Sequence, residues 1–323
     1  MAIVGSGLAL GLIVFLITSR QKEQPNPPGP RLGVIEPASG PSETTHHATA
    51  TGSVLVTARP APAARRVSRP AGDWSRVERL LARPDHLPLM REVPMLSAES
   101  EARLTDLYHS IEGITNKGHI LRILAFGGGS AAAAVLKAAV TTEFSGQKVS
   151  GDGCAILYYV PELCGVLARR NDDAFEFLMA GSKPGFWAGL PLWQEANNTE
   201  VRVGALQGGC IKGLALSGRS EGRQLLRWYR AHPEAAAILG AGGKVVDTVD
   251  GSVVDAAFMA RTVDELGLEA TMDEVFAADL HDMMKTFREW RGTPEGQAWG
   301  RWSAEASAAV RAKTASDAPG EGR

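Results

Sequence analysis

The fold class is decided by the stretch Ile120-Leu121-Arg122-Ile123-Leu124-Ala125-Phe126, which ends in Gly127-Gly128-Gly129 and is followed by an alanine-rich run from Ala131 to Val140. Apolar and alanine-rich runs separated by glycines are typical of two helices joined by a tight turn. The same plan returns where Val201 to Gly218 precedes Gln224 to Tyr229. Strand signals are nearly absent, because no alternating apolar run is bounded by hairpin turns. The sequence therefore predicts an all-α fold built from pairs of helices.

Helix starts recur along the middle of the chain, most of them marked by a capping side chain or by glycine between helices. The first helices of three successive pairs begin near positions 117, 152 and 199, at spacings of about 35 and 47 residues. A period in this range fits a stacked two-helix repeat, in which each pair buries its apolar face against its neighbours. Asp73 and Ser97 are expected to cap two earlier helices. The later starts are expected near Lys117, Ser130, Asp152, Asp172, Thr199 and Ser220.

One of these pairs carries a family signature. The stretch Asn198-Thr199-Glu200-Val201-Arg202-Val203-Gly204-Ala205-Leu206 resembles the Val-Arg-x-x-Ala-Leu pattern that opens the second helix of a HEAT-type (armadillo-like) repeat. The helix pairs at 117–144 fit the same family more loosely, and the resemblance covers roughly residues 117–232. The family implies a short α-solenoid that is used mainly for protein binding. Small residues such as Gly204, Gly208 and Gly209 agree with this, since they allow helices to pack closely.

Two features depart from a regular repeat. Pro161 is expected to interrupt its helix at Val160, because proline lacks a backbone N–H. The segment from Ser182 to Glu195 is too long and too rich in Gly and Pro for a tight turn between helices. These departures leave a compact, irregular all-α domain as the alternative architecture.

The character of the chain changes after Gly240-Ala241-Gly242-Gly243. Val253 to Leu266 is expected to form one helix and Asp273 to Arg291 another. A third should start at Thr293-Pro294-Glu295 and continue to about Ala312. We expect these three helices to cover the open end of the solenoid, as its terminal apolar face requires. The second helix carries a narrow apolar seam of Phe276, Leu280, Met283, Phe287 and Trp290.

The beginning of the sequence predicts a membrane anchor. Ala2 to Thr18 are seventeen uncharged residues, which as a helix would span roughly 26 Å, just short of a hydrocarbon core. A basic stretch before this run and a small-x-small cleavage site after it are both missing, so we expect a retained single-pass transmembrane helix. Arg20, Lys22 and Arg31 follow the run and favour a cytoplasmic location for the body. The reverse orientation, with a periplasmic body, is the alternative.

Composition divides the rest of the chain. Residues 19–72 are rich in Pro, Ala, Ser and Thr and are expected to form a disordered linker. The predicted organisation is an anchor at 1–18, this linker, a helical-repeat domain at 73–240, a C-terminal helical subdomain at 241–312 and a disordered tail at 313–323. The linker carries seven basic and three acidic residues, so the body is net acidic and has no basic stripe. Nucleic-acid binding is therefore not expected.

No pattern of residues predicts catalysis, a cofactor or a metal. Asp279, His281 and Asp282 cannot share a metal, because residues one and two apart point to different faces of a helix. The acids Asp247, Asp250 and Asp255 lack the spacing of a calcium loop. The backbone N–H groups of the 127–130 turn are arranged as in helix starts that bind anions, but a tight inter-helix turn explains them better. The three cysteines, 154, 164 and 210, lie in apolar helical patterns and are interpreted as buried free thiols.

Aromatic residues provide the candidate contact sites. The segment Lys183 to Trp193 is aromatic, and no periodicity places it in a helix. Its rings either anchor a partner protein or fold back to fill a gap between helices. The candidate protein-binding residues are Phe186, Trp187, Trp193, Trp228 and Tyr229.

The resulting functional hypothesis is a membrane-tethered helical-repeat scaffold that binds another protein and has no catalytic activity. One alternative is a lyase-like enzyme with its site in the concave face of the helical body, because the wider resemblance includes such enzymes. Another is a periplasmic envelope-assembly factor of the same fold, if the anchor has the reverse orientation.

Overall fold

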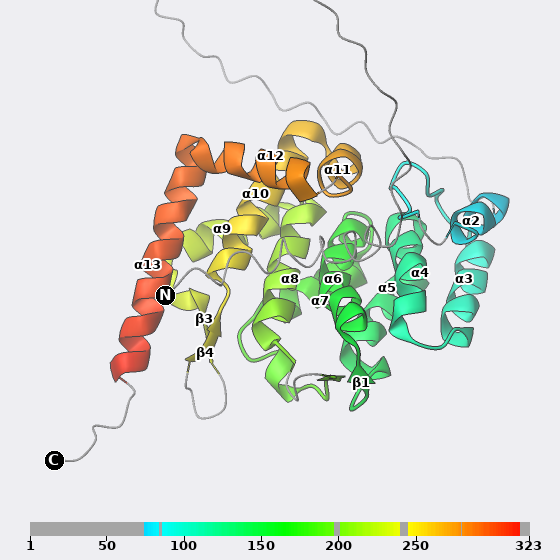
Figure 1. Ribbon diagram of the computed structural model, residues 1–323, viewed down its shortest axis with the longest axis horizontal. Helices are drawn as coiled ribbons and strands as arrows, with labels where there is room; N and C mark the ends of the chain where they lie inside the picture. Colours follow the sequence, from blue (N-terminus) through cyan, green and yellow to red (C-terminus); the bar gives the residue numbers. More distant parts are fainter. Residues whose placement is uncertain (1–73, 84–85, 197–200, 240–244, 279, 317–323) are drawn as a thin grey trace, which may run out of the picture.

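The structure, a computed structural model, describes residues 74–83, 86–196, 201–239, 245–278 and 280–316 (Figure 1). Its described part is mostly helical, which confirms the all-α prediction. The apolar run 2–18, the linker and the tail lie outside these residues. No helix within the described ranges has both the length and the apolar composition needed to cross a membrane. The helices are α2 (Trp74–Leu81), α3 (Ala98–Ser110), α4 (Ile114–Gly127), α5 (Ser130–Ala138), α6 (Gly151–Ala168), α7 (Asp172–Gly181), α8 (Val203–Ser217), α9 (Ser220–Ala231), α10 (Asp250–Leu266), α11 (Leu268–Ala270), α12 (Leu280–Gly292) and α13 (Pro294–Ser316).

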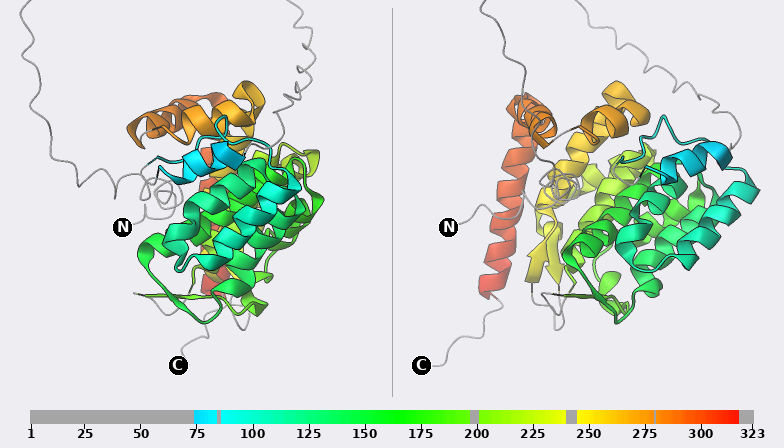
Figure 2. Two further views of the ribbon diagram at one scale, coloured as in Figure 1. Left: turned by 90° about the vertical axis from the view of Figure 1, so that its right-hand side faces the viewer. Right: turned by 45° about the vertical axis from the view of Figure 1, so that its right-hand side comes forward.

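Four helices form a row through the body. α4 packs against α6, α6 against α8, and α8 against α10, while α5, α7 and α9 pack beside them (Figures 1 and 2). α3 lies against α4 and α5 at one end of the molecule, and α13 stands at the opposite end (Figure 1). One continuous cluster of buried apolar side chains extends from Val77 in α2 to Ala306 in α13. The two segments expected at 73–240 and 241–312 therefore share a hydrophobic core.

Capping side chains start several of these helices where the sequence places them. The Ser97 hydroxyl accepts a hydrogen bond from the Ser100 backbone N–H, 3.2 Å away, at the start of α3. The side chain of Asn171 does the same for Ala174 in α7. Gly218 ends α8 with φ of 67°, in the left-handed region that glycine occupies without strain.

Glycine sets the closest approach in the row. A Cβ on Gly165 of α6 would lie 2.2 Å from the Gly213 carbonyl oxygen of α8, so the two backbones touch there. A Cβ on Gly208 would meet the Ser252 hydroxyl of α10 at 2.1 Å. The expected break at Val160 is wrong: α6 continues through Pro161 to Ala168. Pro161 packs against Gly209 of α8, so α8 presents no side chain where the proline ring lies.

The C-terminal helices differ from prediction at one point. Asp273 to Arg291 is not one helix, because α11 leads into a π-helical turn, η5 (Thr271–Val275), before α12 begins. The apolar seam still faces inward, since Phe276, Met283 and Trp290 are buried. α13 begins as predicted, with the Thr293 hydroxyl accepting from the Gly296 N–H.

The N-terminal and C-terminal parts of the described chain meet over one edge of the row. The Asp273 carboxylate in η5 accepts the backbone N–H groups of Met90 and Arg91, at 2.5 and 2.8 Å. The same N-terminal segment contacts α4, where Arg122 Nε donates to the Pro88 carbonyl at 2.7 Å. Residues 88–91 thus connect α4 with η5 in the C-terminal part of the chain.

Short strands complete the fold. β1 (Lys148–Val149) pairs in parallel with β2 (Gln194–Glu195), and β3 (Ala237–Leu239) pairs antiparallel with β4 (Val245–Thr248). Neither pairing was predicted, because two to four residues are too few to show an alternating pattern. The remaining turns are η1 (Ala139–Glu143), η2 (Trp187–Gly189) and η3 (Pro233–Ala236).

Candidate functional site

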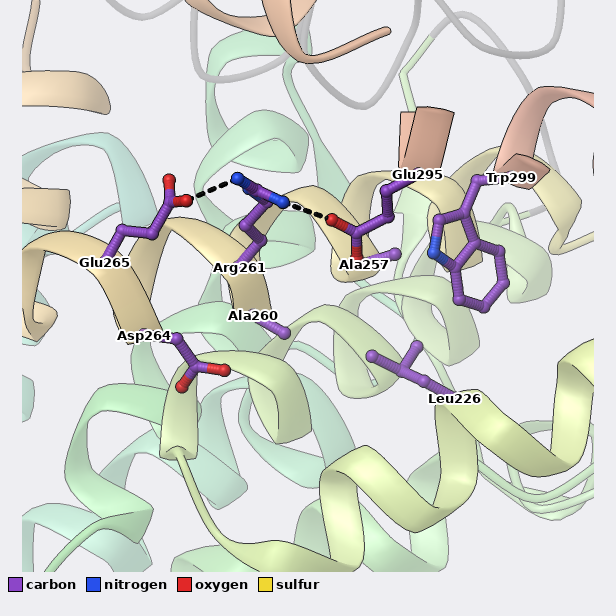
Figure 3. A pocket seen from close by; sticks show the side chains of 8 residues that line it. All are labelled: Leu226, Ala257, Ala260, Arg261, Asp264, Glu265, Glu295 and Trp299. Carbon is purple, nitrogen blue, oxygen red and sulfur yellow. Dashed lines mark hydrogen bonds and ion pairs between the residues drawn. The ribbon is translucent and has the colours of Figure 1, made fainter. Parts of the chain in front are cut away.

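An open pocket of about 320 Å³ lies between α9, α10 and α13 (Figure 3). Its floor is apolar and is made by Leu226 of α9, Ala257 and Ala260 of α10, and Trp299 of α13. The hollow exists because α10 presents two alanines, three residues apart, where larger side chains would fill the space. The Thr293 cap fixes the start of α13 and therefore the position of Trp299 one and a half turns later.

Charged side chains form the rim of this pocket. Arg261 reaches both Glu295 of α13, at 2.6 Å, and Glu265 of its own helix, at 2.5 Å (Figure 3). The hydrogen bond that Arg261 donates to Glu295, and then the one that it donates to Glu265, raise the pKa of its guanidinium. Asp264 pairs with Arg223 of α9. These pairs are exposed, so each contributes at most about 1 kcal/mol of stability and stays available to a partner's polar groups.

A second cluster of charges is buried in the row. Lys212 of α8 forms an ion pair with Glu162 of α6, and the two side chains are 6% and 3% exposed. Asp255 of α10 is buried beside them. Three helices of the row thus each contribute one ionisable side chain to the same interior region. Such a group is retained only when its members compensate one another, because an isolated buried charge is strongly destabilising.

Burial dominates the titration of this cluster. It raises the pKa of Glu162, while the Lys212 ammonium acts in the opposite direction. It also raises the pKa of Asp255 to about 7, with Lys212 as the largest opposing influence and Glu162 adding to the rise. Asp255 is therefore a carboxyl group that exchanges its proton near neutral pH. Chemically, such a group serves either as a proton donor and acceptor for a bound molecule or as a pH-sensitive element of the packing.

The aromatic candidates divide by exposure. Trp187, Trp193 and Tyr229 are at most 3% exposed, so in this structure their rings offer no surface to a partner. Trp187 Nε1 donates to the Gly181 carbonyl at 2.8 Å, and the Trp193 ring packs edge-on against Tyr158 at 5.7 Å. For these two residues the structure agrees with the gap-filling interpretation. Phe186 is partly buried against the core.

Trp228 is the exception, with 45% of its surface exposed. Its ring stacks on His232 one helical turn later, with ring centroids 5.0 Å apart and planes inclined by 26°. The His232 ring nitrogen Nδ1 lies 2.9 Å from the Trp228 carbonyl oxygen, which holds the pair together. Trp228 does not line the pocket, whose α9 wall is formed by Leu226.

The turn before α5 is occupied by the chain itself. The Glu101 carboxylate of α3 accepts the backbone N–H groups of Gly129 and Ala132, at 2.8 and 2.6 Å. Glu101 is buried, and its negative charge lies at the positive end of the α5 dipole. The interpretation of this segment as an inter-helix turn is therefore confirmed, with an internal carboxylate in the place of an external anion.

Asp250, one of the acids that lack the spacing of a calcium loop, also has partners within the chain. The Asp250 carboxylate accepts the hydroxyls of Thr248, Ser303 and Ser307, and so fastens α13 to the start of α10. His281 is exposed on α12, while Asp279 lies outside the described residues. Among the residues that the structure describes, no group of three His, Cys, Asp or Glu side chains is placed to hold a metal ion.

Sequence reasoning missed the buried cluster, although a signal was present. Glu162, Lys212 and Asp255 each interrupt an apolar stretch of a helix, at Val160 to Leu163, Ile211 to Leu214 and Val253 to Ala257. A charge within such a stretch indicates a partner elsewhere in the core. The pocket had no comparable signal, because its walls come from three helices whose packing the sequence does not specify.

Comparison with known proteins places no further constraint on the site. No family model matches the chain, no curated protein matches it, and no solved structure matches it.

Proposed function

We propose that this chain is a HEAT-like helical scaffold, tethered to a membrane by its N-terminal apolar run, that binds a partner protein in the pocket between α9, α10 and α13. The single observation that carries the proposal is the shape and chemistry of this pocket. It is open, has an apolar floor and has a rim of exposed ion pairs. This combination is typical of a protein contact, in which one apolar side chain fills a hollow and polar groups surround it.

The row of helices supports the same proposal. Helices of a two-layer array expose a broad surface without a deep cavity, and such arrays are commonly used to hold other proteins. The Val201-to-Leu206 signature and the serial packing of α4, α6, α8 and α10 both favour a solenoid of this type. The apolar run 2–18 and the basic residues after it favour a membrane anchor with a cytoplasmic body.

Site-specific photo-crosslinking in cells tests the pocket. The full chain carries a photo-reactive phenylalanine analogue at Ala260, on the pocket floor, or at Ala134, an exposed alanine of α5 far from the pocket. We expect one defined crosslinked protein from position 260 and none from position 134. The adduct should disappear when Ala257→Arg fills the hollow. Identical adducts from both positions, or an adduct that survives Ala257→Arg, would refute the pocket as the binding site.

A second candidate function rests on the buried cluster. Glu162, Lys212 and Asp255 converge in the row, and a carboxyl group with a raised pKa beside a lysine is an arrangement that enzymes use for proton transfer. This observation favours the lyase-like alternative. The two candidates separate experimentally, because Asp255→Asn should abolish an activity of the cluster and leave the crosslink at position 260 intact.

The orientation of the proposed anchor also has a direct test. A reporter enzyme that is active only outside the cytoplasm, fused after Arg323, should be inactive. An active fusion would place the body in the periplasm and favour an envelope-assembly role.

A further inference from the structure

Arg122 of α4 is a buried cation whose neighbours carry no negative charge. It is 4% exposed, and its contacts are a carbonyl, a hydroxyl and an aromatic ring. They are the Pro88 carbonyl, 2.7 Å from Nε, the Tyr159 hydroxyl, 3.4 Å from Nη1, and the Phe126 ring, whose centroid lies 4.7 Å from Cζ. Nη2 is buried and donates to no atom of the residues that the structure describes. The edge of the guanidinium formed by Nη1 and Nη2 is therefore almost unused.

The other buried basic side chains in the described part of the chain are compensated. Lys117 pairs with Glu143, and Lys212 pairs with Glu162. An uncompensated charge in a protein interior is strongly destabilising, and a buried donor without an acceptor requires an explanation. A water molecule at Nη2 would accept its hydrogen bond but would leave the positive charge unbalanced. An anion from outside the chain would do both.

The chemistry of the unused edge favours a carboxylate. Nη1 and Nη2 lie in one plane and can donate two parallel hydrogen bonds, which is the geometry that a carboxylate accepts. The Tyr159 hydroxyl accepts from Nη1 and keeps its own proton, so it can donate a third hydrogen bond. One carboxylate balances the single charge of Arg122, whereas a phosphate dianion would leave an excess negative charge in the interior.

The surroundings of Arg122 are apolar and close to the surface. Phe126 is fully buried, while Leu89 and Met90, which follow Pro88 along the chain, are partly exposed. Tyr159 is partly exposed as well. We therefore expect a ligand to enter past these partly exposed side chains and to leave an apolar group in contact with them.

We propose that Arg122 and Tyr159 form a binding site for a small monocarboxylate with an apolar tail, in which Arg122 Nη1 and Nη2 donate to the two carboxylate oxygens. The site lies between α4 and α6 and is separate from the pocket between α9, α10 and α13. Tyr159 and Glu162 are three residues apart on α6 and lie on the same side of it, so the ligand is held beside the buried cluster. The binding site itself depends neither on the scaffold function nor on an activity of that cluster.

Saturation-transfer NMR on the full chain in detergent micelles tests the site, with sodium butyrate as the probe. We expect more transfer to butyrate than protein-free micelles give, and no such excess for butyramide, which has a similar shape and no charge. Arg122→Gln should weaken butyrate binding roughly tenfold or more, because it removes a pair of charge-assisted hydrogen bonds. Tyr159→Phe should weaken binding roughly two- to tenfold.

Two variants serve as controls. Arg170 donates to the carbonyl oxygens of Ala125 and Gly128 at the C-terminal end of α4, so Arg170→Gln should bind butyrate as the natural protein does. Asp255→Asn should also leave butyrate binding unchanged. Failure of the buried cluster as a catalyst is thereby distinguished from failure of the carboxylate site.

Several results would overturn the proposal. They are butyrate binding that survives Arg122→Gln, equal binding of butyrate and butyramide, and an equal loss of binding with Arg170→Gln. Inorganic phosphate that displaces butyrate as well as benzoate does would indicate an adventitious ion only.

Stability gives a test that needs no ligand. In a buffer without carboxylates, Arg122→Met should lower the urea midpoint far less than Lys212→Met does, because it leaves no opposite charge unpaired. Equal losses would show that the Arg122 charge is already compensated within the chain, which would overturn the proposal.

Discussion

Asp255 should make the stability of this protein fall as the pH rises. Burial raises the pKa of Asp255 from an ordinary value of 3.8 to about 7 in the folded state. A raised pKa means that the folded state holds the proton more tightly than the unfolded state does. The stabilising contribution of the protonated carboxyl is therefore complete below pH 3.8 and is lost as the pH rises through 7.

The magnitude follows from the same two values. Their separation corresponds to about 4 kcal/mol in total, of which roughly 2–3 kcal/mol falls between pH 5 and pH 8. Asp255→Asn keeps the shape of the side chain and removes its titration. Relative to the natural protein, we expect the variant to gain roughly 2–3 kcal/mol of unfolding free energy between pH 5 and pH 8.

Urea denaturation of the full chain in detergent micelles, followed by far-ultraviolet circular dichroism, measures this difference. The comparison of the two proteins at each pH cancels the contribution of every other titrating group that the substitution leaves unchanged. Asp264→Asn, at an exposed position on the same helix, is the matched control and should cost less than about 1 kcal/mol. A difference between the natural protein and Asp255→Asn that is constant from pH 5 to pH 8 would refute the reasoning.

Three further contacts within the body are tested by the same denaturation assay. Lys212→Met should lower the free energy of unfolding by about 3–5 kcal/mol, because it leaves Glu162 buried without its partner. Adding Glu162→Leu should restore most of this loss, and a Lys212→Met variant as stable as the natural protein would contradict the prediction. Gly165→Ala should lower the free energy of unfolding by about 2–3 kcal/mol, because the new Cβ would lie 2.2 Å from the Gly213 carbonyl oxygen. Gly151→Ala is the control: its Cβ would meet no atom within 4 Å, so its stability should hardly change. Equal effects of the two alanines would mean that the helices do not touch. Glu101→Ala should lower the free energy of unfolding by about 1–2 kcal/mol, because α5 loses its cap, and Glu101→Gln should keep part of this stability. An unchanged urea midpoint for Glu101→Ala would show that the cap does not stabilise the fold.

The helices were predictable because their signals are local. Ser97, Thr293 and the glycines at 127–129 and 218 mark helix ends through interactions within a few residues, and the structure places ends at each of them. Pro161 misled the prediction because its tolerance depends on Gly209, a residue of another helix. The break at Thr271–Val275 was missed for the same reason, since the N–H groups that Asp273 accepts come from Met90 and Arg91.

The candidate sites show the same limit more strongly. Arg261 and Glu265 are an i, i+4 pair that the sequence displays, but Glu295 joins them only through the packing of α13 on α10. The exposure of Trp228 and the burial of the neighbouring Tyr229 depend on which side of α9 faces α8. The sequence therefore displays local pairs such as Arg261 and Glu265, while the contacts that assemble each site come from the tertiary structure.

The hydrogen bonds from Met90 and Arg91 to Asp273 have a consequence for synthesis of the chain. The acceptor is made more than 180 residues after its donors, so an emerging polypeptide leaves the ribosome with this edge unfastened. Helices near the start of the body can form early, but the hydrogen bonds to Asp273 can form only after most of the body has been translated. Contacts of such long sequence separation form late and slowly. A chaperone that covers the exposed apolar surface of the early helices would therefore be needed mainly before Asp273 has been synthesised.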